Sequence, residues 1–155
     1  YAAEKATATY HEGSVWSYAG KYDIALPCAT QNEINGEAAK RLVAQGVICV
    51  SEGANMPSDL DAIAVYKENG IFYGPAKAAN AGGVAVSALE MSQNSLRLSW
   101  TREEVDGRLK DIMTNIFNTA KTTAETYGLG KDYLAGANIA AFENVANAMI
   151  AQGIV

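Results

Sequence analysis

The sequence has few of the residues that build metal sites or disulfide-bonded folds. Of its 155 residues, two are cysteine (Cys28 and Cys49) and one is histidine (His11). A zinc site needs several such ligands at close spacing, so no metal site is expected. Two cysteines cannot form a disulfide framework, and Cys49 falls within a strand pattern. The sequence therefore favours a reducing compartment, and we expect a cytoplasmic protein.

Basic stripes and long apolar runs are also absent. Lys and Arg number 12 against 17 Asp and Glu, a formal net charge of −5, so nucleic acid is not an expected partner. No stretch of about 18 consecutive apolar residues is present, so no membrane span is expected. Residues 1–10 lack the apolar centre of a signal peptide. Because there is no initiator methionine, we expect either a processed N-terminus or an excised piece of a longer chain, and favour the second.

The residues that are present predict a parallel sheet. Hydrophobic residues make up 49% of the chain and charged residues 19%, which is typical of a globular protein. Short apolar runs at residues 23–26, 47–50 and 70–75 predict three strands, and the second is expected to be buried on both faces because it lacks polar alternation. Helical patterns separate them. This β–α–β–α–β order predicts an α/β fold with a doubly wound parallel sheet.

Caps and apolar stripes predict the helices between the strands. Residues 37–44 are expected to form the first helix. Ser58 is the expected N-cap of the second, because its hydroxyl could accept a hydrogen bond from a free backbone N–H group. We assign the apolar stripe of that second helix to Leu60, Ile63 and Ala64.

The second half of the sequence is predicted to be helical. A stretch of small residues, 78–85, is expected to lead into a helix that runs to about residue 98, and a capping box at Thr101 and Glu104 opens the next helix, which ends near Gly128. A last helix is predicted at residues 139–152. The apolar residues at helical spacing in the last two helices are expected to be core: Val105, Leu109, Ile112, Met113, Ile116, Ile139, Phe142, Val145, Ala146 and Met149.

Each predicted strand is followed by a loop of small residues and neutral polar side chains. The loops are residues 27–32, 52–57 and 77–84. Taken alone, each is as readily a turn or a helix cap, but ligands of open α/β sheets bind beside the carboxyl ends of the strands. In the helix after the third loop, Val84 and Ser87 lie three residues apart and share a face. An apolar wall beside a hydroxyl suits a substrate with a short methylene chain ending in an acceptor.

Several motifs together resemble the C-terminal region of hexameric, bacterial-type glutamate dehydrogenases. They are Pro27-Cys28-Ala29-Thr30-Gln31-Asn32, Glu52-Gly53-Ala54-Asn55-Met56-Pro57, Lys77-Ala78-Ala79-Asn80-Ala81-Gly82-Gly83-Val84 and Glu90-Met91-Ser92-Gln93-Asn94. Later motifs continue the resemblance: Trp100-Thr101, Glu103-Glu104-Val105-Asp106, Gly136-Ala137-Asn138-Ile139 and Ala148-Met149-Ile150-Ala151-Gln152-Gly153. The resemblance covers nearly the whole chain, in order.

The resemblance implies half of a doubly wound, Rossmann-like sheet followed by C-terminal helices. Residues 1–98 would be the C-terminal part of a dinucleotide-binding domain, and residues 99–155 would be helices packing on the same unit. It implies reversible oxidative deamination of L-glutamate to 2-oxoglutarate and ammonia, with NAD or NADP as cofactor, in a homo-oligomer, the family hexamer.

The resemblance implies no catalytic residue in this chain, because the family's catalytic lysines and aspartate belong to a domain that these residues do not contain. No G-x-G-x-x-G motif follows a predicted strand either, so the phosphate-binding turn of a dinucleotide fold is missing from the sequence. The chain alone is therefore expected to be inactive.

The resemblance also implies binding roles. For the substrate, Ser87 would hydrogen-bond the γ-carboxylate and Val84 would line the methylene chain. Asn80, with Asn55, would lie beside the reacting carbon and the nicotinamide end of the cofactor. Three further residues would flank the cofactor ribose and pyrophosphate: Ala29, Thr30 and Gln31.

Two other functions remain open from the sequence. One is a non-catalytic nucleotide-binding or scaffold module, which the missing fingerprint would favour. The other is a dehydrogenase of a different amino acid. Related dehydrogenases of apolar amino acids carry an aliphatic residue where Ser87 stands, and a buried hydroxyl left unpaired by an apolar substrate costs about 1–3 kcal/mol. Ser87 therefore favours glutamate.

Overall fold

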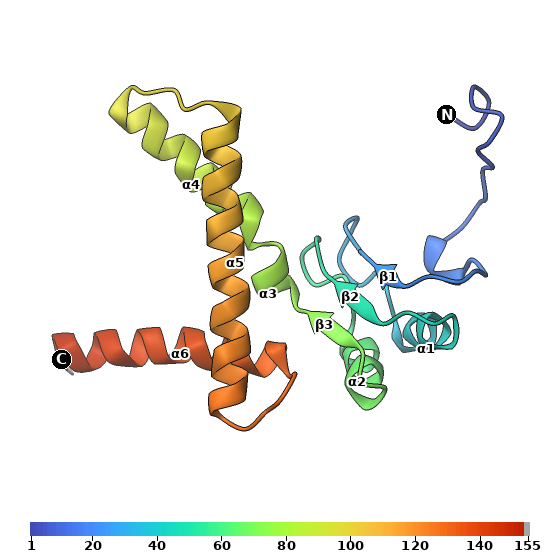
Figure 1. The fold of residues 1–155 in the computed structure, drawn as a ribbon. Helices are drawn as coiled ribbons and strands as arrows, with labels where there is room; N and C mark the ends of the chain where they lie inside the picture. The colour runs from blue at the N-terminus through green and yellow to red at the C-terminus, as the bar shows by residue number, and fades with distance from the viewer. Residues whose placement is uncertain (154–155) are drawn as a thin grey trace.

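The structure, a computed structural model, describes residues 1–153. Residues 154 and 155, the last two of the predicted segment 99–155, lie outside the described residues. A small sheet lies at one end of the molecule and long helices lie at the other (Figure 1). The strands are β1 (Ile24–Ala25), β2 (Cys49–Ser51) and β3 (Phe72–Gly74). The helices are the 3-10 helix η1 (Val15–Ser17), α1 (Gly36–Ala44), α2 (Leu60–Glu68), α3 (Ala76–Ala79), α4 (Ala81–Leu96), α5 (Arg102–Thr126) and α6 (Tyr133–Gln152).

The three strands form one parallel sheet in the order β1-β2-β3. The prediction of a parallel α/β fold is therefore confirmed, although each strand is shorter than the apolar run that predicted it. Helices α1 and α2 connect successive strands and pack side by side on the same face of the sheet (Figure 1). Both connections run in the same direction across the sheet with the same hand, and this places both helices on one face.

Only one face of the sheet is fully covered. Val50 and Tyr73 point to the covered face and are 0% and 6% exposed, whereas Ile24 and Phe72, on the other face, are 58% and 41% exposed. The prediction that residues 47–50 are buried on both faces holds for Val47 and Val50, which are 3% and 0% exposed, and is wrong for the other two, since Cys49 is only half-buried and Ile48, just before β2, is 59% exposed. The main core lies between the covered face and the two helices: Ala25, Ile34, Ala38, Ala39, Leu42, Val47, Val50, Ala62, Val65, Tyr66 and Tyr73.

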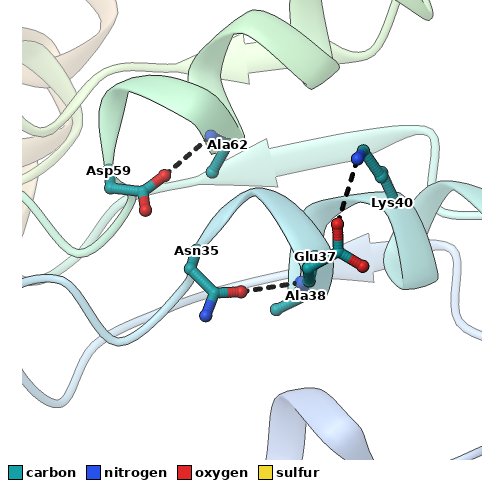
Figure 2. Close-up of polar contacts among 6 residues, drawn as sticks. All are labelled: Asn35, Glu37, Ala38, Lys40, Asp59 and Ala62. Atoms are coloured by element: carbon teal, nitrogen blue, oxygen red, sulfur yellow. Dashed lines mark hydrogen bonds and ion pairs between the residues drawn. The ribbon is translucent and has the colours of Figure 1, made fainter.

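The two helices of the sheet region begin at polar caps (Figure 2). The Asn35 Oδ1 accepts a hydrogen bond of 2.9 Å from the Ala38 N–H, and the Asp59 Oδ1 accepts one of 2.8 Å from the Ala62 N–H. Each bond satisfies a donor that the first helical turn leaves without a partner. The N-cap predicted at Ser58 is therefore wrong by one residue, because Ser58 is buried and forms a parallel bridge with Ile34.

The apolar stripe of α2 also differs from the prediction. Leu60 is 83% exposed, Ala64 is exposed, and Ile63 is only partly buried. The buried positions are instead Ala62, Val65 and Tyr66. These also lie at helical spacing, and the helix is rotated so that its tyrosine, rather than its first leucine, faces the core.

The helix predicted to run to about residue 98 is α4, which ends at Leu96, and the short helix α3 precedes it. The two helices α3 and α4 meet at Asn80, which is both the C-cap of α3 and the N-cap of α4. The capping box at the start of α5 is confirmed, since the Glu104 N–H donates to the Thr101 hydroxyl at 3.2 Å and the Thr101 N–H donates to the Glu104 carboxylate at 2.7 Å. Helix α5 then runs past both α4 and α6 (Figure 1).

Helix α6 begins earlier than predicted, at Tyr133 rather than residue 139. Asp132 is its cap and accepts a hydrogen bond of 3.0 Å from the Ala135 N–H. The added turns bring Gly136 against α5, where a Cβ atom on Gly136 would lie 2.1 Å from the Ala120 carbonyl oxygen. The two helices therefore cross at a point where only glycine fits.

The apolar stripes of α5 and α6 are less buried than predicted. The stripe of α5 is half-buried, and on α6 Phe142, Val145 and Met149 are 71%, 60% and 55% exposed. The prediction that these stripes are core is therefore wrong. Within residues 81–153, the positions that the structure shows as buried are Ala120, Thr123, Ala124 and Gly136. No helix in the described part of the chain is long and apolar enough to cross a membrane.

Candidate functional site

The loops that follow β1 and β2 are joined at the carboxyl edge of the sheet. The Gly53 and Ala54 N–H groups both donate to the Pro27 carbonyl oxygen, at 2.9 and 3.1 Å. Further along, the Asn32 N–H donates to the Met56 carbonyl oxygen at 2.9 Å. These bonds hold the first two of the three predicted ligand-binding loops together, as their position after neighbouring parallel strands requires.

The third loop joins them through two asparagine side chains. The Asn80 NH2 group donates to the Asn55 side-chain oxygen at 2.7 Å and to the Ala54 carbonyl oxygen at 3.1 Å. In residues 1–153, neither the Asn55 NH2 group nor the Asn80 side-chain oxygen makes a further hydrogen bond. The Asn55–Asn80 pair therefore keeps one donor and one acceptor for a ligand.

A hollow of about 720 Å³ lies beside this pair. Its lining includes Asn55, Asn80 and Lys77, and Asn138 of α6 closes another side. The Lys77 ammonium donates to the Asn138 side-chain oxygen at 2.5 Å. The hollow thus lies between the sheet edge and α6, and it has room for a ring with polar substituents.

The predicted substrate residues Val84 and Ser87 lie further along α4. They share an exposed face of that helix, Val84 is 76% exposed, and neither lines the hollow. The Ser87 hydroxyl donates to the Gly83 carbonyl oxygen one turn earlier, at 3.2 Å. The structure therefore brings Asn55 and Asn80 together and leaves Ser87 on the same helix, about two turns away from Asn80.

The predicted cofactor residues Ala29, Thr30 and Gln31 form an exposed turn after β1. Their neighbour Glu33 organises this turn, because its Oε1 accepts hydrogen bonds from the Ala29 N–H at 2.9 Å and the Thr30 N–H at 3.2 Å. Its other oxygen accepts a bond of 2.8 Å from the Trp16 indole N–H. Glu33 already accepts hydrogen bonds from these two backbone donors. The turn can therefore contact a ligand mainly through its side chains, and its small residues allow a ligand to approach closely.

Sequence reasoning missed the residue at the centre of the site, Glu52. This side chain is 2% exposed, directly after β2, and accepts hydrogen bonds from three segments of the chain. Its Oε1 accepts from the Ser58 N–H at 3.2 Å, and its Oε2 accepts from the Tyr73 hydroxyl and from the Ala76 N–H, both at 2.8 Å. The available signal was a carboxylate placed directly after a buried strand, in a loop that is otherwise neutral.

Two buried tyrosines complete this polar cluster. Burial raises the pKa of Tyr66 to about 12, and the Tyr66 hydroxyl lies 3.3 Å from the Ser58 hydroxyl. Burial, together with the hydrogen bond to Glu52, also raises the pKa of Tyr73. Both hydroxyls therefore stay protonated at neutral pH, so Tyr73 remains a donor to the carboxylate. We call Glu52, Ser58, Tyr66 and Tyr73 the Glu52 network.

The site can therefore bind and orient a neutral amide beside a sheet edge. Among residues 1–153, no cluster of histidine, cysteine, aspartate or glutamate has the arrangement of a metal site. The acidic and basic side chains around the hollow are Glu52, which is occupied by three donors, Asp59, which caps α2, and Lys77, which bonds to α6. The arrangement favours binding and positioning over acid–base chemistry.

Comparison with known proteins gives consistent matches. A sequence model of the glutamate/leucine/phenylalanine/valine dehydrogenase family matches residues 1–153. An NADP-specific glutamate dehydrogenase of Giardia intestinalis is 56% identical over 148 residues, which are 94% of this chain and 33% of that protein. A glutamate dehydrogenase of Bacteroides thetaiotaomicron is 55% identical over 156 residues, covering 99% of this chain and 34% of that protein.

Solved structures agree. The crystal structure of Plasmodium falciparum glutamate dehydrogenase superposes with a TM-score of 0.82 and 54% sequence identity, over 86% of this chain and 29% of that one. The chain thus spans about a third of the length of the curated relatives it matches.

Proposed function

The chain belongs to the glutamate/leucine/phenylalanine/valine dehydrogenase family, and on that premise we propose that the whole protein interconverts L-glutamate with 2-oxoglutarate and ammonia, using NAD or NADP as hydride carrier. The observation that carries the proposal is the Asn55–Asn80 pair. In this proposal the chain supplies the wall of the cleft that binds the nicotinamide, and it contributes no catalytic residue.

The pair matches the chemistry of a nicotinamide carboxamide. That group has one acceptor oxygen and one NH2 donor, which complement the donor left on Asn55 and the acceptor left on Asn80. Both asparagines are neutral, so they can hold the ring without adding charge beside a nicotinamide that becomes positive on oxidation. Orienting the ring is the protein's main contribution in hydride transfer, because the cofactor carries the chemistry.

The substrate end of the site would be formed by α4. We propose that the Ser87 hydroxyl donates to the γ-carboxylate of glutamate and that Val84 packs against its methylene chain. To do so, Ser87 would exchange its hydrogen bond with the Gly83 carbonyl oxygen for one with the substrate. Ala29, Thr30 and Gln31 would flank the ribose of the cofactor, where small and polar side chains allow close approach.

Replacing Ser87 tests this proposal in the whole protein. Ser87→Ala should lower kcat/KM for glutamate by roughly 10-fold to 100-fold, the loss of one hydrogen bond to a charged group, while KM for the cofactor stays the same. Ser92→Ala is the matched control, because Ser92 lies on the same helix and its hydroxyl likewise donates to the carbonyl one turn earlier, at 2.8 Å. An unchanged kcat/KM for glutamate in the Ser87 variant would contradict the proposed hydrogen bond between Ser87 and the γ-carboxylate.

The same assays separate glutamate from other substrates. Leucine and phenylalanine should be used far less well by the unmodified protein, and Ser87→Ala should narrow that difference. Equal use of leucine would instead indicate a dehydrogenase of apolar amino acids.

The compartment and the oligomeric state of the whole protein are also part of the proposal. Cys28 and Cys49 are both free thiols, which suits the reducing cytoplasm. We also propose a homo-oligomer, the hexamer that the family resemblance implies.

A further inference from the structure

We infer that Glu52 is a positioning residue, which fixes the geometry of the Asn55–Asn80 pair without touching the cofactor itself. This inference rests on the proposed function, because it assumes that the pair holds a nicotinamide. It concerns a side chain that lies under the proposed binding surface and is 2% exposed.

The burial of Glu52 needs an explanation. A carboxylate removed from water is costly unless its oxygens are hydrogen-bonded, so a chain gains nothing by burying one merely to fill space. Both oxygens of Glu52 are occupied, by the Ser58 N–H on one side and by the Tyr73 hydroxyl and Ala76 N–H on the other. An apolar side chain in its place would leave the two N–H groups without these partners.

Two of the three donors come from the segments that carry the asparagines, and the third, the Tyr73 hydroxyl, comes from β3. Ser58 directly follows the loop of residues 52–57 that carries Asn55, so its hydrogen bond to Glu52 joins the two ends of that loop. Ala76 is the first residue of α3, and the Asn80 N–H donates to the Ala76 carbonyl oxygen at 2.9 Å, one helical turn later. One carboxylate therefore anchors the Asn55 loop at one oxygen and the helix that leads to Asn80 at the other.

This arrangement predicts which part of the cofactor should be affected. If Glu52 acts by holding the two carboxamides in register, then weakening it should impair recognition of the nicotinamide ring and leave the adenine half of the cofactor bound as before. A general loosening of the fold would weaken both halves together. Comparing how a Glu52 variant binds the two halves of the cofactor therefore distinguishes a positioning role from a structural one.

Glu52→Gln is the main variant, made in the whole protein. Glutamine keeps the shape of the side chain but replaces one acceptor oxygen by an NH2 group, so one of the two anchors must be lost whichever way the amide turns. The measurements are kcat and KM with NAD or NADP, and the inhibition constant of ADP-ribose or its 2′-phosphate, which lacks the nicotinamide. Glu68→Gln is the matched control, because Glu68 is exposed on α2.

The expected result is a fall of about 10-fold or more in kcat/KM for the cofactor, with the inhibition constant of the ADP-ribose compound changed by less than about 2-fold. Tyr73→Phe removes one donor and keeps the carboxylate, so it should show the same pattern with a smaller fall. This second variant decides the question if Glu52→Gln does not fold. Glu68→Gln should behave as the unmodified protein.

Two results would overturn the inference: unchanged cofactor use in Glu52→Gln, or equal losses for the cofactor and for ADP-ribose. Failure of the proposed function looks different, because the unmodified protein would then show no glutamate-dependent cofactor reduction. In that case hydrogen–deuterium exchange still tests Glu52. Residues 53–58 and 76–80 should exchange faster in Glu52→Gln, and unchanged protection of both segments would reject the positioning role.

Discussion

The sheet region, residues 23–80, and the helical region, residues 81–153, bury apolar surface in different ways. In the first, eleven apolar residues form one cluster between the covered sheet face and two short helices. In the second, long helices meet at a narrow crossing where small side chains such as Ala120 and Ala124 are buried, while larger ones such as Phe142 stay exposed. The sheet region is therefore stabilised by the packing of apolar side chains, and the helical region by the close approach of helix backbones.

The largest expected effect tests the core of the sheet region. Ile34 is 0% exposed, and Ile34→Ala should lower the free energy of unfolding of the purified chain by about 2–5 kcal/mol, through lost burial and the cavity left behind. Phe142→Ala removes a larger side chain, but at 71% exposure it should change that free energy by less than about 0.5 kcal/mol. Urea denaturation measures both, and similar losses would contradict the contrast between the regions.

The next effect tests the helix crossing. Gly136→Ala places a Cβ atom against the Ala120 carbonyl oxygen, a backbone group that cannot turn aside, so α5 and α6 must separate. We expect a loss of about 1–3 kcal/mol, with faster hydrogen exchange in α6 than in the sheet. Gly107→Ala is the control, because nothing lies within 4 Å of a Cβ atom at that position of α5. That variant should be stabilised by about 0.5–1 kcal/mol. Equal behaviour of the two variants would show that the crossing is looser than described.

The smallest effect concerns an ion pair that links the two regions. The Lys67 ammonium of α2 lies 2.8 Å from the carboxylate of Asp132, the cap of α6. Burial would raise the pKa of Asp132, but the hydrogen bonds from Lys67 and from the Ala135 N–H lower it below its usual value of 3.8. A group with a lowered pKa stabilises the fold above its unfolded value, and that contribution is lost as the pH falls through the folded value.

The contribution of Asp132 to stability should therefore be constant from pH 7 to about pH 5 and should be lost as the pH falls below about 4. Asp132→Asn should remove that part of the acid decline and cost about 1 kcal/mol at neutral pH, since the pair is partly exposed. Glu37→Gln, which breaks the fully exposed pair with Lys40, should leave the acid decline of the Asp132 pair in place. If Asp132→Asn and the unmodified chain lose the same stability at low pH, the Lys67–Asp132 pair does not cause this part of the acid decline.

The sequence was a good guide to the order of elements and a weaker guide to their faces. Alternating apolar runs and helical patterns correctly predict the parallel sheet, because each run is long enough to be recognised and each is bounded by turn residues. The error at Ser58 arose because two adjacent residues, Ser58 and Asp59, can both cap a helix, and only the pairing of Ser58 with Ile34 decides between them.

The stripes of α5 and α6 show what periodicity cannot reveal. The spacing of residues such as Phe142 and Val145 identifies the apolar face of a helix, but it does not say whether another element covers that face. The start of α6 was missed for a related reason. Its first turns are anchored by Asp132 and Gly136, a cap and a close contact, and neither belongs to an apolar stripe.

The candidate site was only partly predictable. The resemblance to a family led to Asn55 and Asn80, and the structure shows that these side chains meet. It gave no reason to single out Glu52 or Glu33, because both act by accepting backbone and side-chain hydrogen bonds across gaps in the sequence of 3 to 24 residues. Such partners are visible only when the chain is folded.

The corner between α3 and α4 has a mechanical consequence. Asn80 caps neither helix with its side chain, which is why that side chain is free to reach Asn55. Because α4 rises about 1.5 Å per residue, Ser87 lies roughly 10 Å beyond the corner, and a swing of about 10° would carry it through nearly 2 Å. Such a swing would leave Asn80 in place. The separation between the asparagine pair and the Ser87 hydroxyl therefore depends on the backbone angles of Asn80 and on the packing of α4 against α5.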